Sequence, residues 1–281
     1  MKTIADSLEV ARSNLVEHVH RPTRRRSAYR KADDAWLLPL LRAIVDERPT
    51  YGYRRVGALL SCHAALLGKP PVNHTRVYRL MRQNGLLLVR HTGTGRPHSH
   101  DGVVRTLWSN LRRCSDAFEV PCWNAETVRV AFVLDTCDRE VITWTATTSG
   151  IAGEHIRDLM VEAVERRFGP VAGAPHAIEW LANNGSAYTA HETIHHAHAL
   201  GLVPCFTPVH SPESNGMAES FVKSFKRDYV FLHARPDARH VLKQLAAWFN
   251  DYNEVRPHRG LRMCTRRQFI RAQLSTATCP D

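Results

Sequence analysis

The order of strand-like and helix-like segments is the feature that most restricts how this chain can fold. Short runs rich in β-branched and aromatic residues lie at 118–123, 128–135 and 140–147, with Asn-Ala and Asp-Arg turns between them. Such runs are typical of three antiparallel strands. Helical periodicity follows at 153–167, and strands and helices then alternate. This order predicts a mixed α/β sheet with flanking helices.

The remaining pattern completes that sheet. It predicts a strand at 177–182, a helix near 189–200, a strand at 202–206, and two closing helices at 214–231 and 237–252. Three antiparallel strands followed by alternating helix and strand match a ribonuclease-H-like core. We therefore expect an α/β fold with a mixed five-stranded sheet, preceded by a small all-helical DNA-binding domain.

That helical domain is predicted from apolar stripes at helical spacing between Asp33 and Val89. Its last helix should begin with Asn73 or His74 as the cap, and it carries three arginines away from its apolar face, as a recognition helix does: Arg76, Arg79 and Arg82. Residues 4–18 resemble part of a helix-turn-helix. The expected domains are 1–32 (partial helix-turn-helix and basic linker), 33–90 (helical DNA-binding domain), 91–105 (linker) and 106–281 (catalytic core).

Charge narrows the class of partner. The chain has 38 Lys and Arg against 27 Asp and Glu, a formal net charge of +11, and residues 51–100 contain no acidic side chain. Most of the basic residues are arginine, whose planar guanidinium matches phosphate oxygens and guanine edges. A polyanion, nucleic acid first, is the predicted partner.

Other features favour a reduced intracellular location. The seven cysteines are scattered singly and should be free thiols. The chain has no apolar run of membrane-spanning length and no signal-peptide pattern at its start. We expect a cytoplasmic, nucleoid-associated protein with no membrane partner.

Two carboxylates stand where metal-dependent chemistry would need them. Asp116 lies at the first strand, and Glu219 lies early in a helix whose next turns carry Lys223, Lys226 and Arg227. Such a pair could share Mg²⁺ ions that activate a water or sugar hydroxyl for attack on phosphate. The alternative is that both are solvated surface acids.

Three longer segments make the chain recognisable. The runs E-W-L-A-N-N-G-S-A-Y (179–188), H-S-P-E-S-N-G-M-A-E-S-F-V-K-S-F-K-R-D-Y (210–229) and Y-N-E-V-R-P-H-R-G-L (252–261) resemble those of bacterial insertion-sequence transposases, whose catalytic core looks like that of retroviral integrases. The most similar subgroup encodes its transposase in two overlapping reading frames, and this chain corresponds to the second. The resemblance extends from P-T-Y-G-Y-R-R-V (49–56) onward.

The resemblance implies a triad of two aspartates and a glutamate, with 35 residues between the last two. Asp116 matches the first member and Glu219 the third, but the second position holds Asn183. A neutral amide cannot bridge two cations as a carboxylate does. Two origins fit Asn183: natural decay, which further departures at Ala182 and Arg266 favour, or a deliberate substitution that traps a bound state.

Several consequences follow from the same resemblance. It implies two Mg²⁺ ions at Asp116 and Glu219, replaceable by Mn²⁺, and binding of double-stranded DNA at transposon ends and target. It also implies a homo-oligomer on DNA and allows fusion to, or association with, the upstream reading-frame product. The expected DNA-binding residues are Arg54, Arg55, Arg76, Arg79, Arg82, Lys223, Lys226, Arg227, Arg256 and His258.

The function so implied is metal-dependent strand cleavage and strand transfer, impaired by Asn183. The alternative is a catalytically inert DNA-binding relative that occupies transposon ends or inhibits active transposase.

A rival motif is the H-E-x-x-H at His191, Glu192 and His195, the pattern of helix-borne zinc sites. No glycine-spaced third histidine follows it, and a distal acid such as Glu213 would have to serve as the third ligand. We expect an amphipathic helix with exposed histidines rather than a metalloprotease.

Overall fold

The computed structural model describes Ser7 and residues 34–89, 106–207 and 215–277. The predicted partial helix-turn-helix at 4–18, the basic segment at 21–26 and the linker at 91–105 therefore lie outside the described residues, apart from Ser7. Within the described ranges no helix is long and apolar enough to cross a membrane.

Three helices form the helical domain: α3 (Asp34–Glu47), α4 (Tyr53–Leu66) and α5 (His74–Gln83). Their predicted apolar stripes meet in one core that includes Leu37, Leu41, Val56, Leu60, Val77 and Leu80, each almost fully buried. Asn73 caps α5 by accepting a 2.8 Å hydrogen bond from the Thr75 N–H, which confirms the predicted start of that helix.

A five-stranded sheet forms the centre of the second domain, in the order β3-β2-β1-β4-β5. The strands are β1 (Arg112–Pro121), β2 (Thr127–Asp135), β3 (Val141–Thr147), β4 (Ile178–Ala182) and β5 (Leu202–Phe206). The pairs β1–β2 and β2–β3 are antiparallel, whereas β1–β4 and β4–β5 are parallel. This arrangement confirms the predicted mixed sheet of the ribonuclease-H-like class.

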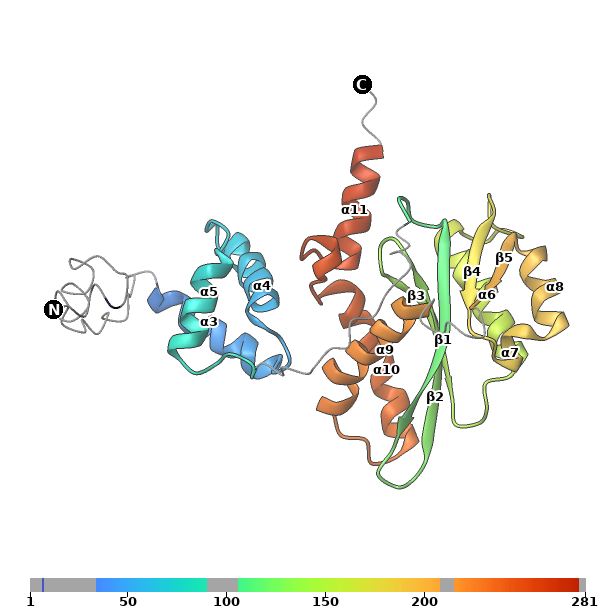
Figure 1. The fold of residues 1–281 in the computed structure, drawn as a ribbon, viewed down its shortest axis with the longest axis horizontal. Helices are drawn as coiled ribbons and strands as arrows, with labels where there is room; N and C mark the ends of the chain where they lie inside the picture. The colour runs from blue at the N-terminus through green and yellow to red at the C-terminus, as the bar shows by residue number, and fades with distance from the viewer. Residues whose placement is uncertain (1–6, 8–33, 90–105, 208–214, 278–281) are drawn as a thin grey trace.

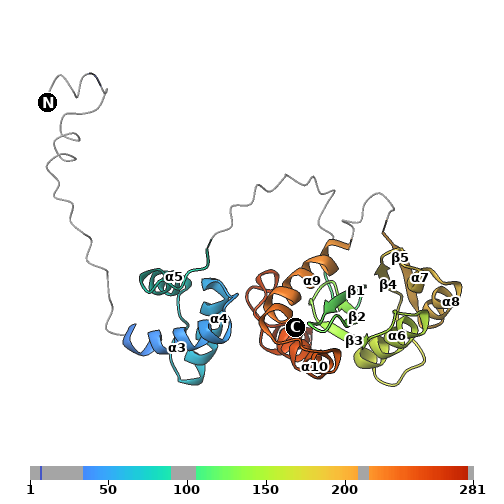
Figure 2. The same cartoon turned by 90° about the horizontal axis from the view of Figure 1, so that it is seen from below.

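Helices cover both faces of the sheet (Figure 2). One core lies under α6 (Gly153–Phe168), α7 (Ser186–Thr189) and α8 (His191–Ala199), and the other lies under α9 (Gly216–Asp228) and α10 (Ala238–Glu254). Short 3-10 turns follow α9 and α10, at η2 (Val230–Leu232) and η3 (Arg259–Leu261). Strand β2 is buried on both faces, since both cores draw on it, whereas the apolar residues of β1 belong to the core under α9 and α10.

Two predictions need correction. The first strand begins at Arg112 rather than at 118, because its early residues pair with both β2 and β4 although they are not β-branched. A further helix, α11 (Arg266–Ala277), follows the two that were expected to close the fold. Its signal was present: Thr265 and Gln268 form a reciprocal capping box, with the Thr265 N–H donating to Gln268 and the Gln268 N–H donating to Thr265 Oγ1.

Ion pairs join the helical domain to the second domain. Arg48, just after α3, donates two 2.6 Å hydrogen bonds to the Asp251 carboxylate on α10. Thr50 donates at 2.8 Å to Asp228 at the end of α9, and Arg55 on α4 lies 3.3 Å from the same carboxylate. Figures 1 and 2 both show α3–α5 on the side of the second domain formed by α9 and α10. Bidentate, partly buried pairs of this kind fix orientation as well as proximity.

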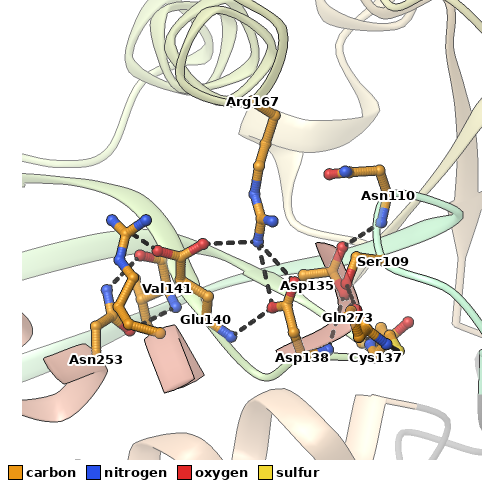
Figure 3. Close-up of polar contacts among 12 residues, drawn as sticks. Ser109, Asn110, Asp135, Cys137, Asp138, Glu140, Val141, Arg167, Asn253 and Gln273 are labelled. Atoms are coloured by element: carbon orange, nitrogen blue, oxygen red, sulfur yellow. Dashed lines mark hydrogen bonds and ion pairs between the residues drawn. The ribbon is translucent and has the colours of Figure 1, made fainter. Parts of the chain in front are cut away.

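A buried charge network holds the β2–β3 turn against its neighbours (Figure 3). Arg167 at the end of α6 reaches into the turn and lies 3.0 Å from Asp138 and 2.8 Å from Glu140. Arg267 of α11 pairs with the other Glu140 oxygen at 2.8 Å. Burial raises the pKa of Asp135, and the adjacent Asp138 charge raises it further. Two arginines thus stabilise a turn that would otherwise hold unpaired buried carboxylates.

Removing Arg167 should therefore destabilise the fold in a pH-dependent way. We expect Arg167→Met to lower the free energy of unfolding by about 3–5 kcal/mol near neutral pH, because buried Asp138 loses its arginine partner and buried Glu140 keeps only Arg267. Burial already raises the folded-state pKa values of Asp135 and Glu140, and both would rise further without the Arg167 charge, which lowers them. Since protonation then favours the folded form, the deficit should shrink as the pH falls towards the unfolded-state values.

Denaturant unfolding at several pH values checks this prediction. The matched control is Arg166→Met, one residue away, whose half-exposed side chain pairs with Glu162 and with no other acid among the described residues. A deficit that is the same for both variants, or that does not change with pH, would contradict the account.

Candidate functional site

The central strand β1 supplies the first member of the site. Asp116 lies at the half-buried middle of this strand, and its Oδ1 accepts the Ala117 N–H at 2.8 Å. Burial raises the pKa of Asp116, and the nearby Glu219 carboxylate adds to the rise, while hydrogen bonds from Ala117 and Asn183 oppose it. The charge of Glu219 is therefore felt at Asp116, as expected for two acids that converge on one site.

Asn183 reaches Asp116 from the neighbouring strand. Strand β4 pairs in parallel with β1 through Cys114 opposite Leu181, so position 183 faces position 116 two residues further along. The Asn183 Nδ2 donates to Asp116 Oδ1 at 2.9 Å, and the Asn183 Oδ1 accepts the Gly185 N–H at 2.9 Å. A Cβ at residue 185 would come within 2.9 Å of that oxygen, so glycine leaves room for the side chain.

Helix α9 brings the third position to the same end of the sheet. Glu219 lies in its first turn, 3.5 Å from Lys223 one turn later. The helix start is held by buried Asn215, whose side chain donates to the Ser115 carbonyl next to Asp116 at 3.5 Å. The structure thus brings together all three positions expected from sequence: Asp116, Asn183 and Glu219.

Sequence reasoning did not single out the residues that support these three. Ser115 lies under the site, where its hydroxyl is 3.0 Å from that of buried Tyr188 and donates to the Phe132 carbonyl. Asn215 could have been found from its place before a glycine and a helix, which is where asparagine often caps. The roles of Ser115 and Tyr188 carry no local signal, because they depend on contact between β1 and α7.

The donor set fits one hard cation better than two. Carboxylate oxygens of Asp116 and Glu219 suit Mg²⁺, which proteins usually hold through one or two carboxylates. At Asn183 the oxygen is taken by the Gly185 N–H, and an N–H donor faces Asp116 instead of a second anion. Among the described residues no three His, Cys, Asp or Glu side chains are gathered so that they could hold a metal ion. Position 183 therefore does not supply the third carboxylate that would bridge a second ion.

The rival zinc motif falls on α8, away from these carboxylates. Glu192 is 81% exposed and lies 3.3 Å from Arg157 of α6, so it is engaged in a surface ion pair. His191 and His195 are both exposed on a short helix, as expected for an amphipathic helix with exposed histidines.

Two arginines of α5 form ion pairs within the helical domain, and the third is exposed to solvent. Arg76 and Arg79 both pair with Asp34 of α3, at 2.8 and 2.7 Å, and each is about one-fifth exposed. Arg82 on α5 and Arg54 on α4 are exposed.

The basic residues expected near the site also differ in exposure. Lys223 is exposed, and Lys226 lies 5.7 Å from the centre of the Phe118 ring. Arg227 pairs with Asp228 through two hydrogen bonds. Arg256 is 1% exposed and pairs with Asp228 at 2.7 Å, so in this structure it holds α9 rather than facing solvent.

Comparisons with known families agree with the geometry. An HTH-like domain family matches residues 31–92, and two integrase core domain families match 109–212 and 200–265. A chain of the simian T-cell lymphotropic virus intasome is 16% identical, with a TM-score of 0.49, and the match covers 82% of this chain and 73% of that chain.

Curated relatives are much closer in sequence. The transposase InsD of an insertion element from Escherichia coli is 49% identical over 244 residues, which are 86% of this chain and 80% of the relative. An insertion element IS136 protein from Agrobacterium fabrum is 53% identical over 194 residues, which are 69% of this chain and 99% of the relative. The chain therefore belongs to the transposases of bacterial insertion elements, with an HTH-like domain followed by an integrase core.

Proposed function

We propose that the chain binds the ends of an insertion element and carries the machinery for DNA strand cleavage and strand transfer, in a form impaired by Asn183. The observation that supports this most directly is the convergence of Asp116, position 183 and Glu219 at one end of the sheet. Membership of the transposase family supports the class of reaction.

The roles of the residues follow from their positions. Asp116 and Glu219 would hold Mg²⁺ or Mn²⁺, which supplies activation of a water or 3′-hydroxyl and offsets charge on the reacting phosphate. Lys223 and Lys226 follow Glu219 on α9, where their charge would hold the DNA backbone beside the site. On the helical domain, exposed Arg54 and Arg82 would make further phosphate or base contacts.

Asn183 is the reason to propose impaired activity. Its amide satisfies Asp116 with a hydrogen bond, which stabilises the site without a cation and reduces its negative charge. The same observation favours the second candidate function, an inert relative that occupies transposon ends or inhibits active copies. An oligomer on DNA and a contribution from an upstream reading-frame product belong to either proposal.

Restoring the carboxylate separates the two functions. With DNA carrying the element's ends and Mg²⁺ or Mn²⁺, Asn183→Asp should raise strand cleavage and joining at least about a hundredfold, because removing one member of a catalytic set commonly costs that much or more. Asn184→Asp is the matched control, since its amide donates to the Thr207 carbonyl instead of to Asp116.

Gel analysis of cleaved and joined products measures the effect. Equal activity of the chain as written and Asn183→Asp would show that position 183 is not part of the metal site. Inactivity of both, with DNA still bound, would support the inert DNA-binding function.

DNA binding should depend steeply on salt, because each phosphate contact releases condensed counterions. We expect Arg82→Gln to reduce the slope of log affinity against log salt by about 0.9, the value for one phosphate contact on duplex DNA. Fluorescence anisotropy between 50 and 300 mM salt would measure the slope. Arg166→Gln, a change of equal charge on the far side of the sheet, should leave the slope as it is. An affinity that ignores salt would overturn the DNA-binding proposal.

A further inference from the structure

A pocket of about 280 Å³ lies where the helical domain, α9 and the segment after α10 meet. Its walls carry four arginines and one histidine and no acidic side chain: Arg55, Arg139, Arg256, His258 and Arg259. Ser220 and Ser224 of α9 complete its polar lining. These two serines follow Glu219 by one and five residues, so they occupy the helix face next to the one that meets Asp116.

Two of the four arginines in the pocket pair with a carboxylate, and the other two do not pair with any acid among the described residues. Arg55 and Arg256 share one carboxylate, that of Asp228. Arg139, in the β2–β3 turn, and Arg259, in η3, pair with no acid among the described residues. Arg139 is nevertheless half-buried, in a turn where its backbone has a φ of 63°. A partly desolvated guanidinium without a counter-ion is costly, and proteins usually supply one.

The positive charge of the pocket also affects the pKa values of two residues in its wall, His258 and Arg55. Burial lowers the pKa of His258 to about 3, and the charges of Arg266, Arg256, Arg139 and Arg55 add to the effect. The Nδ1 atom of that ring is buried and has no hydrogen-bond partner within the described part of the chain. Burial, together with the charge of Arg256, lowers the pKa of Arg55 to about 10. The pocket is thus positive, and it holds a buried ring nitrogen that no described group contacts through a hydrogen bond.

We propose that this pocket binds a phosphate group, and that the phosphate belongs to the DNA backbone beside the reacting strand. The assignment rests on the proposed function and deepens it. Guanidinium forks and serine hydroxyls are the groups that hold phosphate in proteins. Because Arg55 comes from the helical domain and Arg139 from the β2–β3 turn of the second domain, a bound phosphate would also draw the two domains together when DNA is present.

The first test removes the unpaired charge. In the full chain, Arg139→Gln should weaken binding to duplex DNA of the element's end about tenfold or more, as the loss of a charged hydrogen bond does. It should also reduce the salt slope by about 0.9. Arg239→Gln is the control, because it removes the same charge from an exposed position in the first turn of α10.

A second variant guards against simple misfolding. Ser224→Glu places an anion at the pocket wall, so it should raise the melting temperature by about 2–4 °C while it weakens DNA binding. A damaged fold would lower both quantities. A higher melting temperature together with a lower DNA affinity is therefore the result expected only of a pocket that binds an anion.

Inorganic phosphate is the probe that separates the two sources of the ligand. If Arg139→Gln keeps full DNA affinity and slope but loses stabilisation by inorganic phosphate, the pocket holds a free anion and the DNA assignment is overturned. If both variants keep DNA affinity and respond to phosphate as the unsubstituted chain does, the site is wrong, although the proposed function stands. If the unsubstituted chain binds no DNA, the proposed function fails and this assignment fails with it.

Discussion

The carboxylate of Asp228 is the contact on which the arrangement of this molecule depends. It ends α9, the helix whose first turn carries Glu219, and its side chain is 1% exposed. It accepts hydrogen bonds from Thr50 of the helical domain, from its neighbour Arg227, and from Arg256 after α10. These partners hold the pKa of Asp228 below its usual value despite its burial. One buried anion thus fixes the helix that bears Glu219 and anchors the domain proposed to bind DNA.

Local sequence patterns predicted the elements of the fold because each pattern has a local cause. Alternating and β-branched runs gave β2, β3 and β5 nearly to the residue, and Asn73 marked the start of α5 through its cap. The sequence analysis did not predict α11, because its three arginines interrupt the apolar periodicity. The Thr265–Gln268 capping box was the one sequence signal that marked its start.

The sequence predicted the three central positions of the site but not the burial and pairing of its arginines. The resemblance in sequence led to Asp116, Asn183 and Glu219, and the structure brings them together. Burial of arginine could not be predicted from local pattern, since an arginine enters a protein interior only where distant groups meet it. Arg256, expected from sequence to bind DNA, and Arg266, named only as a departure from the family pattern, are both almost fully buried. Arg76 and Arg79 were expected to face DNA, yet both pair with Asp34 in the structure.

The Asn183 amide is the group that sets the charge and the hydrogen bonding of the site. The Asn183 side chain fills its position, satisfies Asp116 and accepts from Gly185, so the fold has no need of a cation there. An aspartate at that position would place a second carboxylate against the first, and their repulsion would favour a bound divalent ion. Replacing the amide nitrogen of residue 183 by an oxygen would therefore make a site that needs no cation depend on a bound divalent ion.

Titration of the full chain with Mn²⁺, followed by electron paramagnetic resonance in the presence of element-end DNA, tests this claim most directly. The account predicts that Asn183→Asp binds Mn²⁺ at least about tenfold more tightly than the chain as written, and that Glu219→Gln in the same background removes the gain. Equal Mn²⁺ affinity with asparagine or aspartate at position 183 would contradict it.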